Sequence, residues 1–250
     1  MKRLSLLGKL LLCMAVIFVL FFWVKGQYEG KRADWETSLE TPLVVEDLSD
    51  RIRETPQITG QHERNLVLPA VVEGHGSNAS GSGSIFEVTA NYVLIVTAGH
   101  VVAENEDLSV TFFHGKESPC EVIKTDSRAD AALLAVKASD LTDEDRKMLC
   151  RVRTGTETYG QLKKNDIIFL VKGNQEEVQI LEGGVVEKDK MLPEFIVPML
   201  YADGTAQKGM SGSPVFDKEG YCIGILVAAT EYGELAILPI AEILPITEFD

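Results

Sequence analysis

The chain has 250 residues, of which 24 are Lys or Arg and 38 are Asp or Glu, so its formal charge is −14 at neutral pH. Its hydrophobic content of 45% can build the core of one or two domains, and its 4 Cys are too few for a disulfide scaffold. The part of the chain after the basic residues 1–32 is more acidic still, which argues against a partner made of nucleic acid.

Residues 1–26 have the pattern of an N-terminal transmembrane anchor. Leu10–Val24 is an unbroken apolar run, and counted from Leu4 the segment is long enough, at about 1.5 Å per residue, to cross about 30 Å of hydrocarbon if Lys9 snorkels. The basic residues before it predict a cytoplasmic N-terminus and an exported body. A cleaved signal peptide, which would give a secreted protein, is the alternative. We favour the uncleaved anchor because the small-residue cleavage pattern is weak.

Residues 27–65 predict a stalk, since they are charged, contain two Thr-Pro pairs and show no core-forming pattern. Residues 66–250 predict one β-rich unit of short strands separated by Gly, Asn, Asp and Lys clusters. The predicted strands are Ser84–Val88, Tyr92–Thr97, Leu108–His114, Glu121–Lys124, Ala131–Val136, Asp166–Val171, Val178–Val186, Phe195–Tyr201, Tyr221–Ala229 and Leu235–Ile240. This spacing favours an all-β barrel or sandwich.

One helix is expected between the two groups of strands. Thr142–Leu149 begins with a residue suited to an N-cap and continues with acidic residues in its first turn. Its position predicts a connection between one barrel at about residues 66–140 and a second at about 151–246.

The cysteines and histidines do not form a metal-binding pattern, so no metal and no cofactor are expected. Cys13 lies in the anchor, which leaves Cys120, Cys150 and Cys222 in the exported part. A disulfide between Cys120 and Cys150 is one alternative, and buried free thiols are the interpretation we favour.

The string Gly209–Pro214, which reads G-M-S-G-S-P, is the most informative part of the sequence. A serine nucleophile needs backbone N–H groups directed at the oxyanion that it generates, and flanking glycines permit the tight backbone that brings such donors together. An ordinary Gly-Ser hairpin is the alternative interpretation of the same string.

Two further residues favour the catalytic interpretation. His100 follows a predicted strand that ends in T-A-G-H-V-V, and Asp130 precedes the apolar strand A-A-L-L-A-V. With Ser211 they supply a nucleophile, a base and a group that orients the base. Asp126 competes for the carboxylate role, but it lies four residues earlier in a polar turn.

The strings T-A-G-H-V, D-A-A-L-L and G-x-S-G-x-P, in this order, resemble the chymotrypsin-fold serine endopeptidases, most of all the bacterial trypsin-like peptidases of the HtrA-type and V8-like branches. The resemblance runs from about Leu66 to Ile246 and includes Gly81–Phe86 and Leu235–Ile240. It implies two orthogonal six-stranded β-barrels with the active site between them.

The resemblance also implies roles for individual residues. Ser211 corresponds to the nucleophile, His100 to the general base and acid, and Asp130 to the carboxylate that orients His100. The backbone amides of Gly209 and Ser211 correspond to the oxyanion hole.

Specificity is the property that the resemblance transfers least. The residues at the expected substrate-binding positions are Thr205, Ala206, Val227, Ala228 and Ala229. They carry no charge, so a small or apolar side chain is expected before the cleaved bond. Met210 stands where trypsin-type enzymes have an Asp that captures a newly cut N-terminus, so no such activation is expected.

The sequence therefore predicts a membrane-anchored, exported serine endopeptidase that acts on peptides or proteins through an acyl-enzyme. No PDZ domain is expected after the peptidase unit. One alternative is a protease-fold module that binds peptides at the cell surface and cleaves them weakly or not at all. Another is a structural or signalling protein without serine reactivity.

Overall fold

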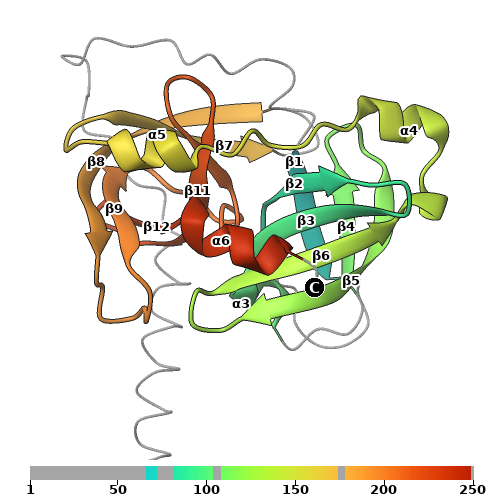
Figure 1. Ribbon diagram of the computed structural model, residues 1–250, viewed down its shortest axis with the longest axis horizontal. Helices are drawn as coiled ribbons and strands as arrows, with labels where there is room; N and C mark the ends of the chain where they lie inside the picture. The colour runs from blue at the N-terminus through green and yellow to red at the C-terminus, as the bar shows by residue number, and fades with distance from the viewer. Residues whose placement is uncertain (1–65, 72–80, 104–107, 174–177, 249–250) are drawn as a thin grey trace, which may run out of the picture.

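The computed structural model of the protein describes residues 66–71, 81–103, 108–173 and 178–248, drawn as a coloured ribbon in Figure 1. The predicted anchor and stalk lie outside these residues. No helix within the described ranges is long and apolar enough to cross a membrane. This part of the chain is mostly β, as the sequence predicts.

The first barrel is built from six strands that pair in the order β1-β2-β3-β6-β5-β4 and close into a ring. These strands are β1 (Leu66–Val71), β2 (Gly83–Val88), β3 (Tyr92–Ala98), β4 (Leu108–Phe112), β5 (Glu117–Asp126) and β6 (Ala131–Lys137). The antiparallel pairing of β1 with β4 closes the ring.

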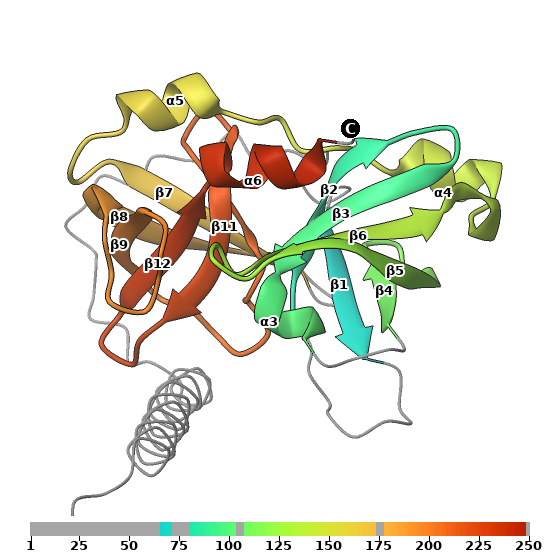
Figure 2. The same ribbon diagram turned by 60° about the horizontal axis from the view of Figure 1, so that its bottom comes forward.

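The second barrel repeats this architecture with the order β10-β11-β12-β9-β8-β7 and closes where β10 pairs with β7. Its strands are β7 (Ile167–Gly173), β8 (Val178–Lys190), β9 (Met199–Gly204), β10 (Pro214–Phe216), β11 (Cys222–Ala229) and β12 (Glu234–Pro239). Figures 1 and 2 show the barrels side by side, with helix α6 (Ile240–Thr247) lying across the junction.

The register between β3 and β6 positions the first half of the candidate site. The two strands pair without a break from Tyr92 opposite Lys137 to Ala98 opposite Ala131. Consecutive side chains of both strands are buried, so both faces of the pair are packed, and a shift of one residue would exchange the side chains between the two faces. Residues just after Ala98 therefore lie beside residues just before Ala131.

The structure corrects several expected boundaries. The strand predicted at Phe195–Tyr201 begins only at Met199, because Pro198 has no N–H to donate and Phe195 is bonded within a turn, to the carbonyl of Leu192. The sequence analysis did not predict β1 or the helices α3 (Gly99–Val102), α5 (Thr156–Gln161) and α6.

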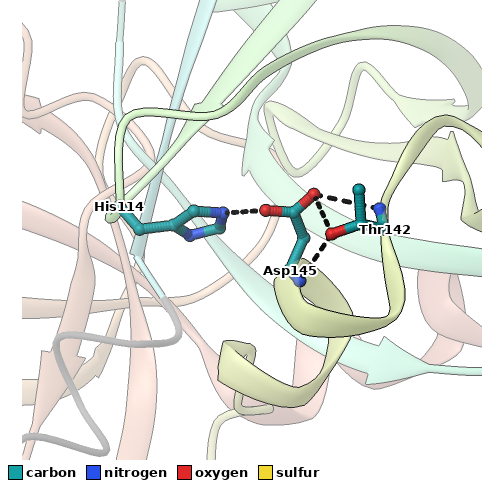
Figure 3. A network of polar contacts seen from close by, with 3 residues as sticks. All are labelled: His114, Thr142 and Asp145. Atoms are coloured by element: carbon teal, nitrogen blue, oxygen red, sulfur yellow. Dashed lines mark hydrogen bonds and ion pairs between the residues drawn. The ribbon is translucent and has the colours of Figure 1, made fainter.

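Helix α4 (Asp143–Met148) forms where the sequence predicts it, with Thr142 as its N-cap. The Thr142 hydroxyl accepts a hydrogen bond from the Asp145 N–H, and the Asp145 carboxylate accepts one from the Thr142 N–H, which completes a capping box. The same carboxylate contacts His114 Nε2 at 3.0 Å, so the turn between β4 and β5 holds α4 against the first barrel (Figure 3).

The three cysteines within the described ranges are free thiols, as we favoured, and the Cys120–Cys150 disulfide is not formed. Cys120 and Cys222 are buried, and Cys150 is partly exposed. Burial raises the pKa of the Cys120 and Cys222 thiols to about 12, so both stay protonated and unreactive at neutral pH.

The capping box generates a prediction about stability at low pH. Hydrogen bonds from Thr142, and then the contact with His114, hold the pKa of Asp145 below its usual value. A lowered pKa in the folded state contributes stability above the unfolded pKa, and this contribution disappears as the pH falls through the folded pKa. Asp145→Asn should therefore destabilise the chain at about pH 5 to 7, and the difference from wild type should shrink near about pH 3.

Glu144→Gln is the matched control, because it removes a charge from the same helical turn outside the capping box. The measurement is urea unfolding of wild type and both variants across this pH range. A loss for Asp145→Asn that equals the loss for Glu144→Gln at every pH would contradict the prediction.

Candidate active site

His100 lies in the short helix α3, which begins where β3 ends. The residue before this helix, Ala98, has no side chain that can cap it. Asp130 supplies the missing acceptors from the neighbouring chain: its backbone oxygen accepts from the Gly99 N–H at 2.8 Å, and its Oδ1 accepts from the His100 N–H at 2.9 Å. The first amides of α3 are thus satisfied from outside the helix.

The second oxygen of the same carboxylate reaches the imidazole ring. Asp130 Oδ2 lies 2.7 Å from His100 Nδ1, and both side chains are largely buried. Asp130 adopts a left-handed backbone with φ of 50°, which is uncommon for a residue other than glycine. A strained conformation of this kind persists where the surrounding contacts over-determine it, as they do here.

Asp126, the competing carboxylate, is occupied within its own turn. It accepts hydrogen bonds from the backbone N–H and from the guanidinium of Arg128. The Arg128 side chain lowers the pKa of Asp126, chiefly through these hydrogen bonds. The structure therefore brings Asp130 to His100 and directs Asp126 to Arg128.

Ser211 lies in the loop that connects β9 to β10 in the second barrel, and only 7% of its surface is exposed. Its backbone oxygen accepts a hydrogen bond of 2.7 Å from the Ser82 N–H, in the first barrel. The next amide, that of Gly212, donates to the Leu226 oxygen of β11 at 2.7 Å. Backbone hydrogen bonds therefore hold the segment around Ser211 to both barrels.

Two backbone amides of this loop remain available. The Gly209 N–H and the Ser211 N–H donate no hydrogen bond to any residue that the structure describes. They flank the peptide group between Gly209 and Met210, and Gly209 has a φ of 83° that favours glycine. Unpaired N–H groups of a buried serine and of the residue two positions before it can donate hydrogen bonds to a negatively charged oxygen.

The backbones around His100 and Ser211 approach each other closely. A Cβ atom on Gly81 would lie 2.5 Å from Val101 Cγ2 and 2.9 Å from the Ser211 oxygen, so Gly81 separates the histidine helix from the serine loop. No hydrogen bond joins Ser211 Oγ to the His100 ring among the described contacts. In unliganded serine sites this bond is often long and tightens when substrate binds.

The expected substrate-binding residues lie on two segments of the second barrel. Thr205 and Ala206 follow β9, and Val227–Ala229 end β11. Strand β12 pairs with both β9 and β11, so the two segments belong to the same end of the sheet. Ala206, Val227 and Ala229 are buried, whereas Thr205 and Ala228 are partly exposed.

Met210 is fully buried, and its Sδ accepts the Gln207 N–H at 3.1 Å. The side chain thus stabilises the serine loop from the inside.

Within the described part of the chain, no group of three or more His, Cys, Asp or Glu residues is placed to hold a metal ion.

Comparison with known families agrees with this geometry. The family model described as "Trypsin-like peptidase domain" matches residues 81–225. This chain belongs to the trypsin-like peptidase family. The matched range includes His100, Asp130 and Ser211.

The curated relatives are serine proteases of the HtrA and DegP type. The chain is 30% identical over 155 residues to a "Probable periplasmic serine endoprotease DegP-like" of Pseudomonas fulva, a match that covers 61% of this chain and 30% of the relative. It is 23% identical over 201 residues to "Serine protease Do-like HtrA" of Bacillus subtilis, covering 76% of this chain and 43% of the relative. The chain thus matches less than half the length of either relative.

Solved structures share the fold. A serine endoprotease from Yersinia pestis superposes with a TM-score of 0.59 at 18% identity, over 75% of this chain and 65% of that one. The structure of Deg5 superposes with the same TM-score of 0.59 at 19% identity, over 74% of this chain and 88% of that one. Both similarities support the chymotrypsin-like architecture.

The sequence analysis gave no individual role to Ser82. The residue lies in the string G-S-G-S, which resembles the segment before the histidine strand of related peptidases, but its contact with Gly209 spans 127 residues. No local pattern predicts a contact at that separation.

The approach of the barrels depends on Gly212, which has a φ of 85°. A Cβ at this position would lie 2.1 Å from the Ser82 oxygen and 2.5 Å from Thr97 Oγ1. Gly212→Ala is expected to lower the free energy of unfolding by about 3 kcal/mol or more, because backbone strain and a clash with backbone combine.

Gly115→Ala is the matched control for this prediction. Gly115 has nearly the same φ, 83°, but nothing lies within 4 Å of the position of its Cβ. Its replacement should cost only about 1 to 2 kcal/mol, from backbone strain alone. Urea unfolding measures both values, and equal losses would show that Gly212 is not a close contact between the barrels.

Proposed function

We propose that this chain is a serine endopeptidase in which Ser211 is the nucleophile, His100 the general base and acid, and Asp130 the residue that orients His100. The observation that carries this proposal is the bond between Asp130 Oδ2 and His100 Nδ1, held on the first barrel beside a serine loop of the second. Membership of the trypsin-like peptidase family supports the same assignment.

In this proposal the three residues share the steps of acyl transfer. Because the Asp130 carboxylate is an acceptor, the proton of the neutral imidazole lies on Nδ1 and leaves Nε2 as the base. Nε2 takes the Ser211 proton as Oγ attacks the carbonyl carbon of the peptide. The protonated ring then donates this proton to the leaving amine, and water releases the acyl group by the same route.

The two unpaired amides act on the charge that develops during this reaction. As Oγ bonds to the carbonyl carbon, the carbonyl oxygen becomes negative and accepts hydrogen bonds from the Gly209 and Ser211 N–H groups. Donors that are already in place do not have to reorganise, and the loss of one such donor typically costs about 10²- to 10³-fold in kcat.

The substrate is a peptide or protein that adds a strand beside Val227–Ala229, by backbone hydrogen bonds. Because Thr205 and Ala206 carry no charge, they favour a small or apolar side chain before the cleaved bond. The Pseudomonas fulva relative is named periplasmic, which supports an exported location for the barrels. The apolar segment Leu4–Val24 anchors the chain in the membrane in this proposal.

The first test distinguishes the two aspartates. Asp130→Asn should fold yet lower kcat/KM on a peptide substrate by about 10⁴-fold, because an amide at this position favours the wrong histidine tautomer. Asp126→Asn should stay within about tenfold of wild type, since its loss affects one exposed turn. Thermal unfolding of each variant shows whether it is folded.

Labelling with a fluorophosphonate separates an enzyme from a module that only binds peptides. Wild type and Asp126→Asn should react at Ser211, whereas Ser211→Ala should not react at all. A folded wild-type chain that neither reacts nor cleaves peptides would favour the binding module. If Asp126→Asn is the inactive variant, the carboxylate assignment is wrong.

The membrane anchor has a separate test. The mature protein should begin at or near Met1 and remain in the membrane pellet after washes at high salt and at alkaline pH, because an apolar spanning helix is not released by either treatment. N-terminal sequencing and fractionation measure this. A soluble protein that begins near Gln27 would instead indicate a cleaved signal peptide and a secreted enzyme.

A further inference from the structure

Ser82 lies just before β2, where the first barrel meets the serine loop, and only 1% of its surface is exposed. All its polar groups are hydrogen-bonded. Its N–H donates to the Ser211 oxygen at 2.7 Å, and its Oγ donates to the Gly209 oxygen at 2.7 Å. Its own carbonyl accepts from Thr97 Oγ1 at 2.7 Å, which ties it to the end of β3.

The side chain of Ser82 acts on the one peptide group that separates the two unpaired amides. The oxygen of that group, on Gly209, accepts from Ser82 Oγ, and its N–H, on Met210, donates to the Gln207 oxygen at 3.1 Å. A peptide group is planar, so these two bonds on opposite sides fix its orientation. Rotation of the group would break both bonds.

Sterics do not hold this peptide group in place. Gly209 has no side chain, and nothing lies within 4 Å of the position that its Cβ would occupy. Glycine also has wide access to other backbone angles. The next peptide group, between Met210 and Ser211, is held from within the loop, because its oxygen accepts a hydrogen bond of 2.8 Å from the Ser213 N–H. The orientation at Gly209 therefore depends on hydrogen bonds, of which the Ser82 hydroxyl supplies the one from the other barrel.

We infer that the Ser82 hydroxyl is a positioning group for the oxyanion hole: it fixes the peptide between Gly209 and Met210, which links the Gly209 and Ser211 amides and so holds them in position relative to each other. This inference rests on the proposed peptidase function. It explains how the loop keeps its shape with Met210 in the place where trypsin-type enzymes have an Asp. The first barrel stabilises the loop in place of a liberated N-terminus.

Ser82→Ala tests the inference, because it removes the hydroxyl and keeps the backbone bond to Ser211. Ser84→Ala is the matched control: Ser84 lies two residues further along, is fully buried, and its Oγ has no hydrogen-bond partner among the described residues. Both variants remove one buried hydroxyl from the same segment of the full-length chain. Ser82→Ala should melt about 2 to 8 °C below Ser84→Ala, because only the former leaves a buried acceptor, the Gly209 oxygen, without its donor.

The expected result is a change confined to the transition state. Ser82→Ala should lower kcat by about 10- to 100-fold with KM within about twofold of wild type, whereas Ser84→Ala should match wild type. The aldehyde acetyl-Ala-Ala-Ala-alaninal, which forms an oxyanion on Ser211, should bind more weakly by the same factor as kcat falls. The matching peptidyl alcohol, which forms none, should bind equally well to all three proteins.

Ser82→Cys and Ser84→Cys form a second pair in case Ser82→Ala does not fold. A thiol is a weak donor, so Ser82→Cys should retain an intermediate kcat and aldehyde affinity. If wild type is active but Ser82→Ala and Ser82→Cys match their Ser84 controls in both quantities, the positioning role is overturned and the proposed function stands. If wild type neither turns over peptide nor reacts with a fluorophosphonate, the proposed function itself is overturned.

Discussion

The hydrogen bonds of Ser82 join the two barrels at the candidate site, and the position of the serine loop relative to the His100–Asp130 pair depends on that junction. His100 and Asp130 belong to the first barrel, whereas Ser211 belongs to the second. Contacts of 2.7 Å from Ser82 to the serine loop hold the halves at a fixed separation. Such buried bonds are stronger than exposed ones because little water competes for them.

A second constraint comes from the close approach of the two barrels: some backbone positions between them have no room for a side chain. Gly81 and Gly212 occupy the narrowest places, where a Cβ would lie within 3 Å of atoms from other segments. Gly212 also needs a left-handed backbone, so it satisfies a steric and a conformational requirement together. Gly212 thus contributes to the docking of the barrels as well as to the backbone of the serine loop.

Asp130 concentrates several functions in one residue. It caps α3 with two acceptors and orients the imidazole with a third, although its own backbone is left-handed. Charge-assisted bonds to this partly buried carboxylate offset the cost of the conformation. The fully buried Cys222, by contrast, is inert at neutral pH because burial raises its pKa to about 12.

The sequence by itself determined the features that depend on neighbouring residues. Most strands follow from short apolar runs, α4 follows from the capping pattern at Thr142, and the three motifs around His100, Asp130 and Ser211 indicate the family. Capping, turn formation and strand propensity act over a few residues, so a local pattern can predict them.

Only the tertiary structure decided which groups meet across the chain. Asp126 and Asp130 both remained candidates in the sequence, and the register of β6 against β3 brings Asp130 to His100. The bond from Ser82 to Gly209 joins residues that are 127 positions apart. Such contacts depend on how the barrels close and pack together, which no local propensity encodes. For this physical reason the sequence indicated the candidate side chains of the site, and the fold alone showed what holds them in place.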